Sequence, residues 1–375
     1  MQPSRSSPRV STCLLPQVDQ HDYYGLPNEI YCMTFDEDGT TFLFTRYALY
    51  IVTENGTTAV VSGNEFESGF ADGIRAEARY NGPRGMILDR EKKLMYVVDT
   101  GNHALRIIAM WNGFVHTVAG CGQENGFLDG VGGAARFSFP VSIVLCNDGS
   151  IYICDRQNHS LRHVTLGGHH VNQYGPFMGN PLPATVRTLC GGTMYGTRAL
   201  PYVGDPWLPA LDTVTLHGAS DGLCQVARFD NPMGIALDRK GNIIVADSGN
   251  NMIRSVNIKS GVTSTLLGMK SAETAIINHP TSVDVDDFGN IIIADCYNNQ
   301  IRVLRTCGRM HTLAGGGAQY ADGRAPPYQE SVNGRGASVR FNQPQQVVLH
   351  NGILHVVEKS NEFWTRRLKY TASEA

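Results

Sequence analysis

The hydrophobic pattern of this chain consists of short apolar runs separated by turn-forming residues, and the same succession of runs returns several times. In one copy the runs are Gly234–Asp238, Asn242–Asp247, Met252–Val256 and Thr263–Leu267. Residues typical of tight turns, such as Gly and Asn, separate the first three runs. The second run is apolar at consecutive positions, which is typical of a strand covered on both faces. Each unit therefore predicts four antiparallel strands, and long amphipathic helical patterns are absent from the sequence.

Recurring anchor residues allow the copies to be counted. Each clear copy has a proline before its first strand, an acidic residue ending its second strand and an arginine in its third strand. The prolines are Pro83, Pro140, Pro232, Pro280 and Pro344. The acidic residues and arginines are Asp99 and Arg106, Asp155 and Arg162, Asp247 and Arg254, Asp295 and Arg302, with Glu358 and Arg366 in an altered last copy. The spacing between Asp247 and Asp295, 48 residues, is typical of propeller blades.

With a worn first copy that lacks the Asp and Arg anchors, the units number six. They predict a six-bladed β-propeller of four-stranded antiparallel blades. The predicted blades are residues 28–63, 64–120, 121–191, 217–268, 275–315 and 338–370. This ring occupies residues 28–370 as a single domain, between an N-terminal segment, 1–27, and a tail, 371–375.

The last copy stops after its third strand, so its outer strand must come from elsewhere. Val10–Leu15 has the pattern of an outer strand. We therefore expect residues 9–15 to pair with the last blade and close the ring, which removes open sheet edges. The alternatives are a disordered tail or a removable leader at this end of the chain.

The units resemble NHL repeats. Asn102–Arg106 and Asn158–Arg162 carry the residues that give this family its name, and Asn250–Arg254 and Asn298–Arg302 are common variants. An Asp-Gly pair followed by Arg, as in Asp72–Arg79, precedes three of the units and is a further signature of an NHL subfamily. The resemblance covers about 64–370 clearly and 28–63 weakly. It implies a propeller but no single function, because NHL propellers include RNA-binding modules, protein-interaction scaffolds and metal-dependent lyases.

Composition limits both the functions that this resemblance allows and the cellular location of the protein. The chain of 375 residues is 42% hydrophobic and has a formal net charge of −3, so it can bury a large core but lacks a global basic field for nucleic acids. No apolar run is long enough for a membrane span, which predicts a soluble protein. Nine cysteines without a C-x-x-C spacing are typical of a reducing compartment. We expect an intracellular, cytoplasmic protein. A mitochondrial location is the alternative, since residues 1–18 hold no acidic residue.

Several residues imitate catalytic or metal sites until the copies are aligned. His103 and His159 occupy the position of Asn251 and Asn299, which indicates a turn-stabilising role rather than metal ligation. His279 alone precedes an inner strand, whereas a zinc site needs about three ligands. The segment 284–289 imitates a calcium loop but lacks the downstream glutamate. The repeated Asp and Arg anchors are assigned to capping and to bracing the blades. We therefore predict no catalytic residue, no metal and no cofactor.

Insertions that do not repeat are the better place to look for function. They span residues 166–187, 192–217 and 316–337. The second and third each join an outer strand to the next inner strand, so both belong to one face of the ring. Their aromatic residues are good interface anchors, and the alternative is that they cover apolar blade surface. The candidate partner-binding residues are Tyr195, Tyr202, Trp207, Tyr320 and Tyr328.

These observations favour a non-enzymatic protein-interaction scaffold, or a structural subunit of a larger complex, that docks an unidentified protein through one face. Two alternatives stay open. An RNA-binding NHL propeller would need a basic face, for which scattered arginines are available: Arg198, Arg324, Arg335 and Arg340. A metal-dependent lyase or lactonase-like enzyme would need converging His, Asp or Glu residues at the channel mouth, where the aligned positions supply His279 alone.

Overall fold

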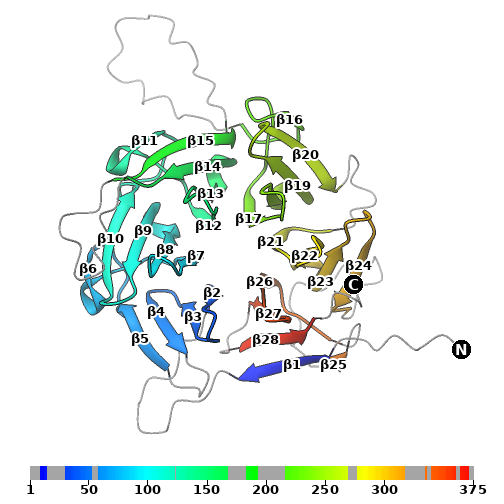
Figure 1. The fold of residues 1–375 in the computed structure, drawn as a ribbon, viewed down its shortest axis with the longest axis horizontal. Coiled ribbons are helices and arrows are strands. Elements are labelled where there is room, and N and C mark those ends of the chain that lie inside the picture. Colours follow the sequence, from blue (N-terminus) through cyan, green and yellow to red (C-terminus); the bar gives the residue numbers. More distant parts are fainter. Residues whose placement is uncertain are drawn as a thin grey trace, which may run out of the picture.

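The computed structural model shows six small antiparallel sheets arranged in a ring (Figure 1). Their inner strands line a central channel with a cavity of about 310 Å³. This confirms the predicted six-bladed β-propeller. The structure describes residues 9–14, 30–52, 58–122, 124–167, 183–192, 216–268, 277–316, 334–335, 339–359 and 364–370. No helix in these ranges is long and apolar enough to cross a membrane.

The first three blades follow the chain in order, each from an inner strand to an outer strand. The first contains β2 (Cys32–Phe35), β3 (Thr41–Phe44), β4 (Ala48–Val52) and β5 (Thr58–Gly63). The second contains β7 (Gly85–Asp89), β8 (Leu94–Asp99), β9 (Ala104–Ala109) and β10 (Phe114–Ala119). The third contains β12 (Pro140–Leu145), β13 (Ile151–Asp155), β14 (Ser160–Thr165) and β15 (Thr185–Gly191).

The remaining blades repeat this order. The fourth contains β17 (Pro232–Leu237), β18 (Ile243–Asp247), β19 (Met252–Asn257) and β20 (Val262–Leu267). The fifth contains β21 (Pro280–Val285), β22 (Ile291–Asp295), β23 (Gln300–Leu304) and β24 (Met310–Ala314). The sixth contains β26 (Pro344–His350), β27 (Ile353–Glu358), β28 (Trp364–Lys369) and, from the start of the chain, β1 (Arg9–Leu14).

The start of the chain closes the ring. β1 pairs antiparallel with β28, in a register that runs from Val10 opposite Leu368 to Leu14 opposite Trp364. In Figure 1 the blue β1 lies beside the red β28. The predicted closure by residues 9–15 is thus confirmed, and the third strand of the last blade is not left as an open edge.

Four blades carry a fifth strand of two residues that the hydrophobic pattern does not predict. β6 (Gly73–Ile74), β11 (Gly130–Val131) and β16 (Gly222–Leu223) pair with the outer strands of their own blades. β25 (Gly334–Arg335) pairs with β1 in the same way. Residues 334–335 were assigned to the third insertion, which therefore ends earlier than its sequence suggests.

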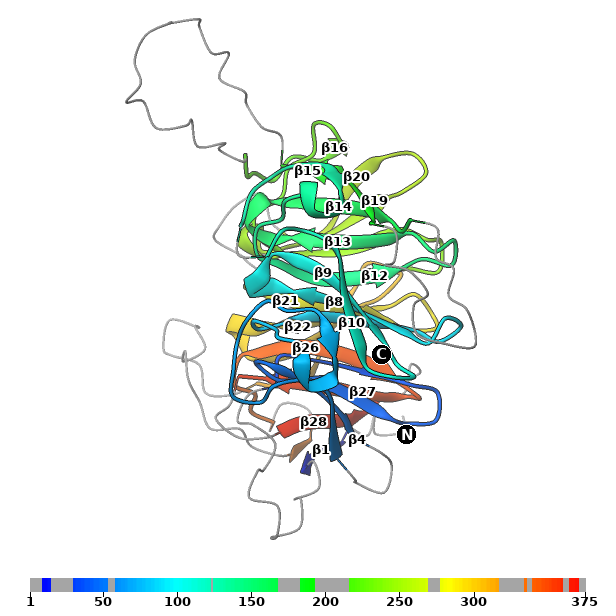
Figure 2. The same cartoon turned by 90° about the vertical axis from the view of Figure 1, so that its left-hand side faces the viewer.

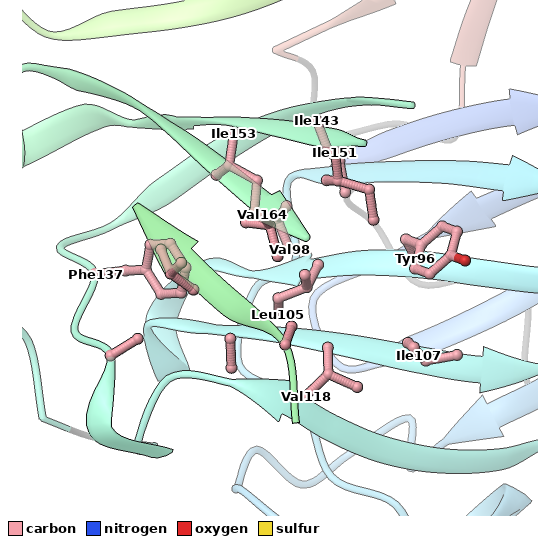
Figure 3. Close-up of a cluster of buried hydrophobic side chains, with 14 of the residues drawn as sticks. Tyr96, Val98, Leu105, Ile107, Val118, Phe137, Ile143, Ile151, Ile153 and Val164 are labelled. Atoms are coloured by element: carbon pink, nitrogen blue, oxygen red, sulfur yellow. The ribbon is translucent and has the colours of Figure 1, made fainter. Parts of the chain in front are cut away.

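The hydrophobic core lies between neighbouring blades rather than in one central mass (Figure 3). Side chains of the second blade, such as Tyr96 and Ile107, form one cluster with Ile143 and Ile153 of the third blade. Every residue of β8 is buried, as expected for a strand covered on both faces. In the side view the blades stand next to one another around the ring (Figure 2). Each blade therefore needs both neighbours to bury its two faces.

The ring has two distinct faces, which we name here. The mouth face carries the residues that precede each inner strand and the 3₁₀ turns that follow each second strand, such as η4 (Arg156–Asn158) and η7 (Cys296–Asn298). The turn face carries the tight turns between first and second strands, such as residues 286–289. The chain leaves the mouth face at Gly192, after β15, and at Gly316, after β24.

Candidate functional site

The repeated Asp and Arg anchors form buried ion pairs inside each blade. Asp99 accepts hydrogen bonds from Arg106 at 2.9 Å, from Asn102 at 2.8 Å and from the backbone N–H of Asn81 at 2.9 Å. Both charged side chains are 0% exposed. The equivalent ion pairs are Asp155 with Arg162 at 2.7 Å, Asp247 with Arg254 at 2.9 Å, and Asp295 with Arg302 at 3.5 Å. The anchor carboxylates therefore brace the strands of each blade.

A second aspartate completes this arrangement in blades two to four. Asp72, from the Asp-Gly stretch, accepts a hydrogen bond from Arg106 at 2.8 Å, and from both the N–H and the hydroxyl of Thr117 at 2.9 Å. The rings of Phe70 and Tyr80 lie 5.0 and 5.1 Å from the Arg106 guanidinium. Asp129 and Asp221 make the same contacts with Arg162 and Arg254. The Asp-Gly stretch is therefore a latch that holds the two-residue strand against the outer strand.

The histidines of the repeat connect neighbouring blades. His103 and His159 follow 3₁₀ turns in the left-handed conformation, with φ of 52° and 50°. Their Nδ1 atoms accept the backbone N–H groups of Phe139 and Asn231 in the next blade, both at 3.1 Å. Asn251 and Asn299 accept the equivalent N–H groups of His279 and Gln343. Burial lowers the pKa of His103 and of His159, which favours the neutral ring that this hydrogen bond requires.

The segment that imitates a calcium loop is a tight turn. Asp286 accepts hydrogen bonds from the N–H groups of Phe288 and Asn290, from the Asn290 amide and from the Tyr370 hydroxyl of the sixth blade. Its carboxylate oxygens are thus used within the fold. Across the described ranges, no group of three His, Cys, Asp or Glu side chains could hold a metal ion.

Polar side chains in the channel wall form hydrogen bonds between neighbouring inner strands. Ser142 accepts the N–H of Ile235 at 3.2 Å, and Ser282 accepts the N–H of Val347 at 3.3 Å. Asp284 accepts the N–H of Leu349 at 2.7 Å, and burial raises the pKa of this aspartate to about 6. These bonds join the inner strands of the third and fourth blades and of the fifth and sixth blades. The channel is consequently a braced ring of inner strands.

A pocket of about 250 Å³ opens at the channel mouth, on the mouth face. Residues that line it include Tyr31, Arg84, Arg156, His279, Tyr297 and Lys359. Tyr31, Arg84 and Met233 also line the adjoining channel cavity of about 310 Å³, so the pocket continues inward. The ring of His279 stacks on that of Tyr297 with centroids 4.5 Å apart. Side chains from several blades therefore meet at a single concave site.

Two arginines at this mouth depart from the repeat. Arg84 follows Pro83, where four other blades have Val141, Met233, Thr281 and Gln345. Arg156 follows the Asp155 anchor, where the others have Thr100, Ser248, Cys296 and Lys359. Both arginines lie next to anchors rather than at them, so alignment of the anchors alone does not single them out. A departure from the repeat at these neighbouring positions is the signal that could have found them.

Neither arginine is neutralised by a carboxylate of the described residues. Arg84 is exposed and its guanidinium lies 4.8 Å from the ring centroid of Tyr31. The Nε atom of Arg156 is buried and has no hydrogen-bond partner. Burial, and then the neighbouring charge of Arg84, lower the pKa of Arg156. Burial and then the charge of Arg156 also lower the pKa of His279, against an opposing effect of Asp230. Lys359 and Glu358 line the same pocket.

The predicted partner-binding residues Tyr195, Tyr202, Trp207, Tyr320 and Tyr328 lie outside the described residues, as do Arg198 and Arg324. Arg340 is described and is exposed shortly before β26. The two insertions that carry the aromatic residues begin at Gly192 and Gly316, both on the mouth face.

Comparison with known proteins identifies relatives of similar sequence. The chain is 27% identical to protein SUPPRESSOR OF QUENCHING 1, chloroplastic, of Arabidopsis thaliana over 223 residues, which cover 58% of this chain and 18% of the relative. It is 25% identical to NHL repeat-containing protein 2 of Gallus gallus over 230 residues, which cover 50% of this chain and 31% of the relative. The chain thus spans less than a third of the length of either relative.

The fold itself matches solved propellers. Virginiamycin B lyase of Staphylococcus aureus superposes with a TM-score of 0.53 at 9% identity, covering 97% of this chain and 100% of that one. This level of identity shows a common fold alone. The NHL repeat family matches residues 137–164, 229–254 and 278–304, which run from the approach to the inner strand as far as the third strand of blades three to five. Together with the six-bladed ring and the relatives, these matches support an NHL-repeat β-propeller, with NHL repeats in its third, fourth and fifth blades.

Proposed function

We propose that this protein is a non-catalytic interaction scaffold that docks a protein partner on its mouth face. One observation carries the proposal. The repeated His, Asp and Arg side chains are engaged in holding the blades together, whereas side chains that do not repeat gather on the mouth face. The points where two insertions leave the ring lie on the same face. A face that combines exposed aromatic and cationic side chains is typical of a protein interface.

The choice of a scaffold over an enzyme rests on how the titratable groups are used. A metal-dependent lyase or lactonase needs several ligands converging on one ion. At the described mouth, His279 donates its backbone N–H to Asn251 and stacks its ring on Tyr297, and Glu358 accepts the N–H of Asn342 at 2.6 Å. Metal content of the purified protein distinguishes the two functions. One tightly held zinc or calcium ion per chain would favour the enzyme.

Partner recovery tests the proposal directly. The tagged protein is purified from its native cell, and bound proteins are identified and quantified for three variants. Tyr297→Ser removes an aromatic ring that is 48% exposed on the mouth face. Phe288→Ser is the matched control, since this ring is 70% exposed on the turn face of the same blade. The third variant lacks residues 195–210.

The proposal expects that Tyr297→Ser and the deletion each reduce recovery of the partner at least fivefold, because aromatic anchors contribute on the order of 1–2 kcal/mol or more to an interface. Phe288→Ser is expected to leave recovery unchanged. Equal recovery with all three variants, with each ring shown to be folded by its thermal unfolding, would exclude docking on the mouth face.

We also propose that this docking takes place inside the cell, with the cytoplasm favoured over an organelle. The cysteines support a reducing compartment: the eight for which the structure gives a state are all free thiols, five of them buried. The relative from Arabidopsis thaliana is chloroplastic by name, which keeps an organelle as the alternative. Imaging of the chain fused at its C-terminus to a fluorescent protein separates the two locations.

A further inference from the structure

Arg84 and Arg156 differ from the other internal arginines of the ring in their charge balance. Arg106, Arg162 and Arg254 are fully buried, and each is neutralised by two aspartates. Buried charges in folded proteins are normally paired, because an unpaired charge loses its hydration without compensation. Arg156 is half-buried in the pocket wall and makes no ion pair with a described carboxylate, and Arg84, a second cation, lines the same pocket. A like-charge pair in one pocket is the arrangement that an anionic ligand would stabilise.

The geometry of the pocket suits one small planar anion. A guanidinium presents parallel N–H donors that match the two oxygens of a carboxylate. The stacking of Arg84 on Tyr31 restricts the orientation of its donors. The pocket volume of about 250 Å³ admits one side chain rather than a segment of folded structure. Tyr297, at the rim, offers an apolar ring to the aliphatic part of that side chain.

We propose that Arg84 and Arg156 form an oxyanion site at the channel mouth, which binds the carboxylate of an acidic side chain on the docked partner. This inference rests on the proposed scaffold function and specifies the chemistry that the partner must present. The anchor on the partner is a glutamate or aspartate in an exposed segment, inserted into the mouth pocket.

A carboxylate is favoured over an RNA phosphate because the positive charge is local. RNA binding without sequence preference needs a basic groove that follows the backbone over several nucleotides. Glu67 and Glu124 are exposed on segments that approach the mouth face, where they pair with Arg79 and Arg136. The net charge of the chain is −3. Arg79 and Arg136 are thus neutralised and do not extend the positive charge of Arg84 and Arg156.

Fluorescence anisotropy tests the site without knowledge of the partner. The probes are a fluorescein-labelled peptide of four glutamates, the same peptide with four glutamines, and a labelled octauridylate RNA. We expect the glutamate peptide to bind the full chain with an affinity that falls as salt rises, and the glutamine peptide to bind at least tenfold more weakly. Arg84→Gln and Arg156→Gln are each expected to weaken binding of the glutamate peptide at least tenfold.

Two further variants make the test specific. Arg239→Gln is the matched control, since Arg239 is exposed on the turn face, where it pairs with Asp287. It is expected to leave binding of the glutamate peptide unchanged. Arg156→Lys keeps the charge but loses the guanidinium fork, so an intermediate loss is expected. Thermal unfolding of each variant checks its fold, and removal of the unpaired charge in Arg156→Gln is expected to leave the unfolding midpoint equal or higher.

Several results would overturn the site. They are equal binding of the glutamate and glutamine peptides, binding that survives both Arg84→Gln and Arg156→Gln, and preferential binding of the octauridylate that these substitutions abolish. Partner recovery from the native cell separates this failure from failure of the scaffold function. If Tyr297→Ser loses the partner while Arg84→Gln and Arg156→Gln retain it, docking on the mouth face stands and the oxyanion site falls.

Discussion

At the scale of single residues, the same side-chain type serves different purposes according to its partners. Arg162 and Arg156 are six positions apart in one blade. The first is enclosed by two aspartates and two aromatic rings, whereas the second lines the pocket and makes no ion pair with a described carboxylate. Alignment of the repeats is enough to assign Arg162 a structural role from the sequence alone. The charge balance of Arg156 depends on which blades meet at the mouth, and this information is absent from the local sequence.

The buried ion pairs of the blades differ enough to make a matched test. Asp155→Asn leaves the fully buried Arg162 without its closest carboxylate, and breaking such a pair costs about 3–5 kcal/mol. Asp295→Asn is expected to cost less than half as much. Its ion pair with Arg302 is longer, at 3.5 Å, and the Arg302 side chain is 16% exposed. Free energies of unfolding from urea titrations measure both losses, and losses of equal size would contradict this account of the anchors.

At the scale of elements, long strands were predictable and very short ones were not. The consecutive apolar residues of Ile243–Asp247 predicted a strand covered on both faces, and every residue of β18 is buried. The short strands β6, β11 and β16 have two residues each, and a hydrophobic period cannot be recognised in so few residues. They are held by the aspartate latch and by pairing with an outer strand. In the sequence the Asp-Gly stretch therefore indicates a family signature, and its structural role appears only in the fold.

The latch leads to a local prediction in the third blade. Asp129 accepts the backbone N–H of Thr188 at 3.0 Å and its hydroxyl at 2.8 Å, which joins the segment of β11 to β15. Asp129→Ala removes both acceptors, so we expect the Thr188 amide to exchange its hydrogen at least tenfold faster. The Thr117 amide, held by the intact Asp72, is the internal control and is expected to be unchanged. Hydrogen exchange followed by NMR or mass spectrometry measures both sites. Unaltered exchange at Thr188 would show that β11 is held by other contacts.

At the scale of the whole molecule, the six residues of β1 contribute to the stability of every blade, because they close the ring. Clusters of buried side chains lie between consecutive blades, so the sixth blade supports the first as well as the fifth. Val357 of the sixth blade packs in one cluster with Phe35 and Leu43 of the first. This circular dependence is typical of propellers, in which no blade can bury both of its faces alone. A ring opened at one blade would expose the apolar surface that lies between that blade and its neighbours.

Removal of β1 tests this dependence. Deleting residues 1–15 takes away the partner of β28, whose register with β1 joins five residue pairs. At about 1 kcal/mol for each hydrogen bond, the loss is about 3–5 kcal/mol. We therefore expect an unfolding midpoint roughly 4–6 °C lower. The open edge of β28 should also cause aggregation on size-exclusion chromatography. Deleting residues 1–8 is the control, because it leaves every one of these pairs in place, and its midpoint should match that of the full chain. If the longer deletion were equally stable and monomeric, the ring would be closed by the blade contacts alone, and β1 would be dispensable to the fold.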